Sequence, residues 1–157
     1  MLVYRITHKS FSKELYASGA KGRWNGEGKK VIYCAESIPL AFLENMVRRQ
    51  GVGFNDDFKI MIIEIPGYLK ITSISMADLK DGWRNFKDFS KCQPWGNKWY
   101  DEAQTPILKV PSAVLPDAFN YVINTTHPDY KEIKLIGSTD LVPDERIEDI
   151  LKKYSGK

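Results

Sequence analysis

The chain has 157 residues, of which 43% are hydrophobic and 27% charged, values typical of one soluble globular domain with an ordinary core. No apolar run approaches the roughly 18 residues that a membrane span needs, and the N-terminus lacks the pattern of an export signal. A net charge of +3 is too small and too dispersed to imply a nucleic-acid partner. The cysteines Cys34 and Cys92 form neither a metal-ligand spacing nor a disulfide framework, so we expect a reducing, cytoplasmic location.

Hydrophobic periodicity and turn residues predict strands and helices throughout residues 1–157, with no linker between domains. The expected strands are Leu2–Ile6, Val31–Cys34, Phe58–Ile65, Tyr68–Ile71, Ile107–Val110 and Glu132–Ile136. The expected helical segments are a loop or short helix at Phe11–Tyr16, a helix at Ile38–Gln50 between an N-cap at Ser37 and a stop at Gly51, short helices within Met76–Glu102, and a helix at Arg146–Tyr154. Because it is apolar on both faces, Phe58–Ile65 is expected to be central. This order predicts a compact, single-domain α+β fold with a mixed central sheet and flanking helices.

The most informative segment, from Gly22 to Glu44, reads GRWNGEGKKVIYCAESIPLAFLE. Its helical part places Glu44 within about 40° of Leu40, beside an apolar stripe formed by Leu40, Leu43 and Val47. A carboxylate at the edge of the core needs a cation, hydrogen bonds or a proton. We expect either a structural pair with a buried Arg or a carboxylate at a cleft wall, where it stabilises positive charge on a substrate.

Three further residues are candidates for binding an anionic ligand. Arg23 lies among glycines that let the backbone approach a ligand, and its guanidinium matches phosphate oxygens, although it could equally stack on Trp24 or be the buried Arg that pairs with Glu44. Tyr33 taken alone is compatible with an ordinary core position in a strand. Arg5 and Tyr4 alternate along the first strand, so Arg5 becomes relevant only if it faces Arg23.

Ser112 follows the strand at Ile107–Val110 and is not part of a GxSxG elbow. With only His8 and His127 available, a Ser-His-acid triad has no sequence support, and capping of a turn is the default reading of this serine. His127 and Asp129 do not form a metal motif, so we assign no metal.

Several short motifs together resemble the RES domain family, which is named for its characteristic Arg, Glu and Ser residues. These motifs are YR at Tyr4–Arg5, GRWNGEG from Gly22, VIYCAES and PLAFLE between Val31 and Glu44, GNKWY from Gly96, VPSAV from Val110, and N followed by HPDY between Asn124 and Tyr130. The residues that give the family its name correspond to Arg23, Glu44 and Ser112. The chain departs from the pattern at Asn97, where an acidic residue is expected before Trp99.

The resemblance implies a core similar to that of ADP-ribosyltransferase toxins and a role as the toxin of a type II toxin–antitoxin pair that depletes NAD+. The implied activity is that of an NAD+ glycohydrolase or phosphorylase, with NAD+ as substrate rather than cofactor and water or inorganic phosphate as acceptor. The implied partner is an Xre-like helix-turn-helix antitoxin that covers the active site in a cytoplasmic hetero-oligomer, without direct nucleic-acid or membrane binding by the toxin. By the family's pattern, the pocket is lined by Arg5, Arg23, Tyr33, Glu44 and Ser112.

The chemistry of the bond suggests roles for these residues. Cleavage of nicotinamide from ribose builds oxocarbenium-like charge and releases a neutral leaving group, so we expect Glu44 to stabilise that charge. Arg5 and Arg23 would hold the pyrophosphate, Tyr33 would orient the nicotinamide ribose, and Ser112 would bond the ribose or the amide.

Two alternatives remain at this point. The same pocket would serve a transferase that attaches ADP-ribose to a macromolecule. The basic residues interleaved with Trp83, Trp95, Trp99 and Tyr100 would suit an RNA-binding or RNase-like module.

Overall fold

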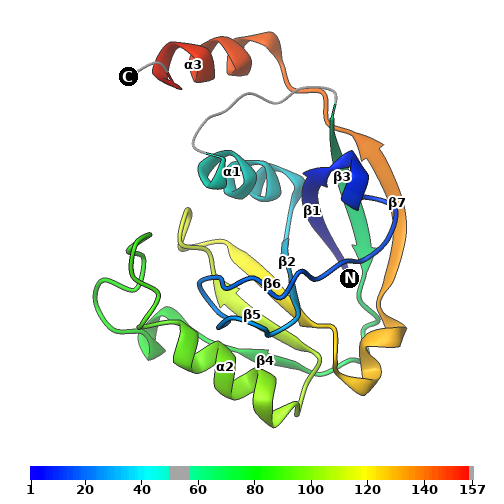
Figure 1. The fold of residues 1–157 in the computed structure, drawn as a ribbon, viewed down its shortest axis with the longest axis vertical. Helices are drawn as coiled ribbons and strands as arrows, with labels where there is room; N and C mark the ends of the chain where they lie inside the picture. The colour runs from blue at the N-terminus through cyan, green and yellow to red at the C-terminus, as the bar shows by residue number, and fades with distance from the viewer. Residues whose placement is uncertain (50–56, 156–157) are drawn as a thin grey trace.

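The computed structural model describes residues 1–49 and 57–155. Within them, seven strands form one mixed sheet: β1 Leu2–His8, β2 Val31–Ala35, β3 Phe58–Glu64, β4 Ile71–Ser73, β5 Ile107–Pro111, β6 Phe119–Asn124 and β7 Lys134–Asp140. The same residues form three α-helices, which flank the sheet (Figure 1): α1 Ile38–Arg48, α2 Gln93–Glu102 and α3 Glu145–Ser155. Short 3₁₀ helices lie at Lys9–Phe11, Met76–Asp78 and Pro128–Glu132. The predicted α+β class with a mixed sheet is confirmed.

The strand order is β4-β5-β6-β2-β1-β3-β7, and β4 with β5 is the parallel pair among the described strands. β1 pairs with β3 along its whole length, from Leu2 opposite Glu64 to His8 opposite Phe58. Its pairing with β2 is recorded at one position, Tyr4 opposite Ala35. The sheet therefore opens between β1 and β2, in the middle of the strand order (Figure 1).

Helices α1 and α2 cover opposite halves of this opened sheet (Figure 1). Leu40 and Ala41 of α1 pack in a cluster with Ile6 of β1 and Ala35 of β2. Trp99 of α2 packs in a separate cluster with residues of β5 and β6 in the other half of the sheet. Each helix thus buries an apolar face against strands on its own side of the opening.

Helix α1 begins as predicted, because the Ser37 hydroxyl oxygen accepts a hydrogen bond from the Leu40 backbone N–H at 3.3 Å. Pro39 occupies the first turn, where its missing N–H costs nothing. The helix ends at Arg48, and the predicted stop at Gly51 lies outside the described residues.

Several element predictions need correction. β3 is internal but not central, because β2 occupies the middle of the strand order. The strand predicted at Tyr68–Ile71 forms at β4, and the single long helix of the middle region is α2. β6 was not predicted, although it pairs with both β2 and β5.

None of the helices in residues 1–49 and 57–155 is long and apolar enough to cross a membrane.

Candidate active site

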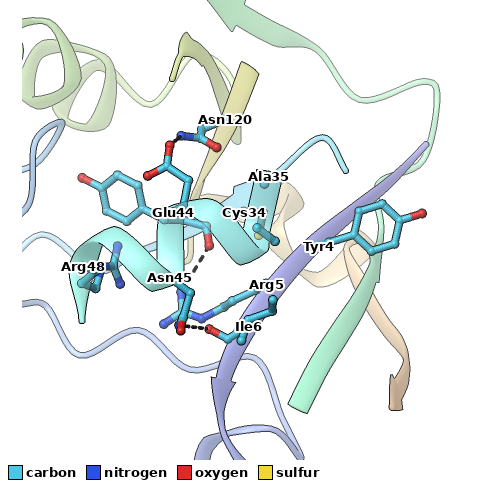
Figure 2. A pocket seen from close by; sticks show the side chains of 11 residues that line it. Tyr4, Arg5, Ile6, Cys34, Ala35, Glu44, Asn45, Arg48 and Asn120 are labelled. Carbon is cyan, nitrogen blue, oxygen red and sulfur yellow. Dashed lines mark hydrogen bonds between the residues drawn. The ribbon is translucent and has the colours of Figure 1, made fainter. Parts of the chain in front are cut away.

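A cavity of about 1160 Å³ lies beside the opening between β1 and β2. Its walls come from the start of the chain, the glycine-rich loop, β2, α1, and the loops before α2 and after β5. A smaller space of about 60 Å³ lies between α1 and strands β1, β2 and β6 (Figure 2). Both spaces are lined by Arg5, Tyr33, Glu44, Arg48 and Asn120.

The Glu44 carboxylate is held by two neutral donors. The Ser112 hydroxyl donates to Oε1 at 2.7 Å. The Asn120 amide donates to the same oxygen at 2.6 Å (Figure 2). Among residues 1–49 and 57–155, Glu44 has no ion-pair partner. The alternative in which Glu44 pairs with a buried Arg such as Arg23 is therefore wrong, and hydrogen bonds hold this side chain.

Ser112 is fully buried and its hydroxyl is fully engaged. Besides donating to Glu44, its Oγ accepts the backbone N–H groups of Val114 at 3.1 Å and Leu115 at 3.0 Å. The serine therefore caps a turn, as predicted from the sequence. The same turn directs its hydroxyl hydrogen toward the Glu44 carboxylate. Its bonding partners do not include a histidine, so the structure gives no support to a triad.

The face of α1 that carries Glu44 differs from the predicted one. Leu40 and Ala41 are buried, whereas Val47 is 55% exposed and lines the cavity together with Glu44 and Arg48. Residues three and four positions apart share a helix face, so Val47 belongs to the cavity wall rather than to the core.

Arg5 projects from β1 at the point where the sheet opens. Its Nη1 donates a long hydrogen bond of 3.5 Å to the Tyr33 carbonyl, which bridges the two strands. Burial is the main cause that lowers the pKa of Arg5, and the nearby charge of Arg48 acts in the same direction. Arg5 and Arg23 line the same large cavity. The sequence made Arg5 a candidate for ligand binding only if it lay on the same side as Arg23, so Arg5 remains a candidate.

Arg23 forms hydrogen bonds with the loop that precedes α2. Its Nη1 donates to the carbonyls of Trp83 at 2.6 Å and Asn85 at 3.1 Å, and its Nη2 donates to that of Arg84 at 3.3 Å. The guanidinium also lies 4.9 Å from the centre of the Phe89 ring. Its aromatic partner is thus Phe89 and not Trp24, the alternative left open by the sequence.

The Tyr33 side chain links β2 to the glycine-rich loop. Its hydroxyl accepts the Trp24 N–H at 3.0 Å and donates to Asn25 Oδ1 at 2.6 Å. Burial raises the pKa of Tyr33 to about 12, so the hydroxyl stays protonated and remains a donor. Gly22 is required beside it, because a Cβ there would lie 2.7 Å from the Tyr33 hydroxyl oxygen.

Asn97, where the chain departs from the family pattern, forms a hydrogen bond with the glycine-rich loop. Its Oδ1 accepts the Gly26 backbone N–H at 2.8 Å. An acidic side chain would supply the same kind of acceptor, so the departure preserves the contact and lies away from Glu44.

Both histidines cap turns. The Nδ1 atoms of His8 and His127 cap the turns that begin at Ser10 and Asp129. In the part of the chain that the structure describes, no group of three His, Cys, Asp or Glu side chains is arranged to hold a metal ion.

The sequence reasoning missed two residues of the site. Arg48 lies one turn after Glu44, and this spacing was the available signal. Asn120 lies on β6, a strand that was not predicted, so no pattern pointed to it. Both line the two cavities together with Glu44, and Figure 2 shows them around the smaller one.

Comparison with known proteins identifies the family. A family model of the RES domain matches residues 2–147, so the chain belongs to the RES domain family. It is 29% identical over 149 residues to the protein named Toxin Res of Pseudomonas putida, covering 94% of this chain and 99% of that protein. It is 34% identical over 127 residues to the Prs ADP-ribosylating toxin of a Sphingobium species, covering 77% and 78% of the two chains.

The fold is similar to a chain of the MbcT–MbcA toxin–antitoxin complex from M. tuberculosis, with a TM-score of 0.73. That match covers 99% of this chain and 89% of the other, at 18% sequence identity.

Proposed function

We propose that this protein is the toxin of a toxin–antitoxin pair and that it splits the nicotinamide–ribose bond of NAD+. The observation that carries the proposal is the Glu44 carboxylate, fixed by Ser112 and Asn120 at the wall of a cavity that three arginines also line. The volume, about 1160 Å³, is sufficient for a dinucleotide. Membership of the RES domain family and the names of its toxin relatives support this assignment.

The bond-breaking step uses the free oxygen of Glu44. Ser112 and Asn120 both bond Oε1, and Oε2 accepts no hydrogen bond from residues 1–49 or 57–155. As the C–N bond breaks, its electron pair leaves with nicotinamide, which becomes neutral, and positive charge develops on the ribose. A fixed carboxylate beside that charge lowers the barrier without proton transfer to the leaving group. Water or phosphate then forms the new bond to the anomeric carbon, and water loses a proton as it does so.

The arginines supply the charge that the pyrophosphate needs. Arg5 and Arg48 line the cavity on the same side as Glu44, where guanidinium groups match phosphate oxygens. Arg23 donates three of its N–H groups to loop carbonyls, so in this proposal it shapes the rim and offers its remaining donors to the ligand. Tyr33 also lines the cavity, where in this proposal it orients the nicotinamide ribose.

For Ser112, we propose a role that differs from the direct ligand contact expected from the sequence. Its side chain is fully buried and its hydroxyl already makes three hydrogen bonds. Ser112 therefore acts on the reaction by orienting Glu44.

The direct test is to incubate the purified protein with NAD+, with and without inorganic phosphate, and to identify the products by mass. Free nicotinamide with ADP-ribose would support hydrolysis, and nicotinamide with ADP-ribose 1″-phosphate would support phosphorolysis. Intact NAD+ in both incubations would contradict the proposal.

A transferase is the second candidate, because one relative carries the name Prs ADP-ribosylating toxin. The same pocket would activate NAD+ for attack by a group on a macromolecule. Incubation of a bacterial extract with NAD+ labelled in its adenosine separates the two activities. Label on a protein or nucleic acid would favour the transferase, and label in small products alone would favour degradation.

The RNA-binding alternative loses much of its support. Trp83 is 8% exposed and Trp99 is 5% exposed, and both pack in one apolar cluster with Trp24. Buried rings cannot stack on bases, so the core explains Trp83 and Trp99, whereas Trp95 is 43% exposed.

We also propose that the partner is an Xre-like antitoxin that covers the cavity, in the cytoplasm. Phe11, Tyr16 and Phe86 line the cavity and are 52%, 49% and 75% exposed, an apolar rim of the kind that protein partners bury. The structural neighbour was solved as a toxin–antitoxin complex. The addition of the purified antitoxin should stop NAD+ consumption; undiminished consumption by a stable complex would contradict coverage of the cavity.

A further inference from the structure

We infer that Asn120 is a positioning residue for catalysis, which acts by fixing the Glu44 carboxylate from the neighbouring strand. The inference rests on the proposed cleavage of NAD+. It adds a residue beyond the Arg, Glu and Ser that give the family its name. Its basis is the hydrogen bond between Asn120 of β6 and Glu44 of α1 (Figure 2).

The backbone places Asn120 where it reaches α1. In the sheet, Asn120 lies opposite Ala35 of β2 on one side and Val110 of β5 on the other. Its Nδ2 reaches Glu44 Oε1 at 2.6 Å. Because a carboxylate only accepts hydrogen bonds, the amide NH₂ must face Glu44, and this fixes which way the Asn120 side chain points.

Stability alone does not explain an asparagine at this position. Its Oδ1 is buried and has no hydrogen-bond partner in the structure. A buried amide oxygen without a donor destabilises the folded state. An apolar side chain of similar size would avoid this loss, so the contact with Glu44 is the feature that the asparagine provides.

Two anchors from two strands define the orientation of one carboxylate. Ser112 directly follows β5, and Asn120 lies on β6, so the donors approach Oε1 from different backbone segments. A glutamate has three side-chain torsions, and one anchor leaves some of them free. With both anchors in place, Oε2 has a fixed direction toward the substrate, and a misplacement of about 1 Å can reduce the rate about 100-fold.

The test compares Asn120→Leu with wild type in NAD+ consumption, NAD+ binding and thermal unfolding. We expect kcat to fall about 100-fold, with the Kd for NAD+ within about twofold of wild type and a melting temperature that is unchanged or higher. Asn120→Asp has nearly the same volume but places an acceptor against an acceptor, so it should lose as much activity. It also keeps the inference testable if the leucine variant fails to fold.

A matched control lies on the same strand. Asn124 is fully buried, but its amide bonds the Tyr100 carbonyl and its Oδ1 accepts from Thr126, away from Glu44. Asn124→Leu should lower the melting temperature while kcat per folded molecule stays at the wild-type value. Combining Asn120→Leu with Ser112→Ala should cost less than the product of the two single losses, because both residues act on one oxygen.

The outcomes separate this inference from the proposed function. If wild type does not consume NAD+, the proposed function fails. If wild type is active and folded Asn120→Leu or Asn120→Asp keeps its kcat, the positioning role is overturned. A fully multiplicative loss in the double variant, or an equal loss of kcat in Asn124→Leu, would also overturn it.

Discussion

Glu44 owes its place in the cavity wall to groups outside its own helix. Its position on α1 brings it to the edge of the core, but Ser112 and Asn120 determine where its oxygens point. Both donors are neutral, and Glu44 forms no ion pair with the residues that the structure describes, although Arg5 and Arg48 line the same cavity. A carboxylate held in this way is suited to face a positive charge that exists only during the reaction.

Replacement of Ser112 by Ala tests this arrangement at the residue scale. The change removes the proton donated to Glu44 and leaves the Val114 and Leu115 N–H groups without their acceptor. We expect stability to fall by about 1–3 kcal/mol and kcat to fall about 10- to 100-fold. Urea unfolding and NAD+ consumption measure the two effects.

Ser138 on β7 provides the control, since it is exposed and Ser138→Ala should change neither quantity. A Ser112→Ala variant that is destabilised yet retains wild-type kcat would show that the serine is only a turn cap.

The sequence identified individual site residues better than their roles. Arg5, Arg23, Tyr33 and Glu44 do line one cavity, because the chain places distinctive side chains on a strand, a glycine loop and a helix. The guanidinium of Arg23 and the hydroxyl of Tyr33 bond neighbouring loops, and those contacts arise from long-range packing. Local patterns do not record such contacts.

At the scale of elements, the docking of α2 on the glycine-rich loop depends on one small residue. A Cβ added to Gly96 would lie 1.7 Å from the Trp24 carbonyl oxygen, so only glycine allows this approach. The Gln93 amide also donates to the carbonyls of Gly22 and Asn25 from the same helix. The loop that carries Arg23 is therefore held by α2.

Gly96→Ala should consequently destabilise the protein by about 3 kcal/mol or more, since backbone must move to relieve the clash. Gly67→Ala is the matched control, because an added Cβ there meets nothing within 4 Å. Thermal unfolding of both variants measures the difference. Equal melting temperatures would contradict the packing described for α2 and the loop.

Most elements could be predicted because their periodicity is local, as for α1 with its Ser37 cap. β6 could not be predicted, since its sequence FNYVIN includes two asparagines, which are uncommon in strands. The last four of its six residues, Tyr121–Asn124, are all buried, so the strand also lacks an alternation of buried and exposed positions. The pairing with β2 and β5 stabilises the strand against this weak propensity. The failure to predict β6 also hid Asn120.

At the scale of the whole molecule, the cavity arises because β1 and β2 pair only at Tyr4 and Ala35 and then separate. No local sequence pattern determines where two strands separate. At this opening Arg5 is partly buried and lines the space between α1 and the strands, whereas Cys34 lies in the core.

Burial of Cys34 makes stability depend on alkaline pH. Burial raises the pKa of Cys34 from 9.0 to about 12, and the charge of Arg5 only partly opposes this shift. Above pH 9 the unfolded thiol loses its proton while the folded one keeps it, so stability is full below pH 9 and falls as pH rises toward 12. In the pH range where the thiol is ionised only in the unfolded state, the free energy of unfolding falls by about 1.4 kcal/mol per pH unit.

Cys34→Ala should therefore show a shallower fall in unfolding free energy between pH 9 and 10.5 than wild type. Urea unfolding at several pH values measures both slopes. The pKa of Tyr33 is also raised to about 12 by burial, and its contribution is the same in both proteins. Identical slopes in the two proteins would mean that the thiol is not buried in the folded state.

The most direct measurement is the rate of NAD+ consumption by Glu44→Gln. Glutamine keeps an oxygen that accepts from Ser112 and Asn120 but removes the negative charge. The control is Glu36→Gln, whose Oε1 accepts the Phe119 N–H away from this contact. We expect Glu44→Gln to stay folded, to bind NAD+ within a few-fold of wild type, and to consume it about 1000-fold more slowly, while Glu36→Gln matches wild type. A folded Glu44→Gln protein that consumes NAD+ at the wild-type rate would contradict the account.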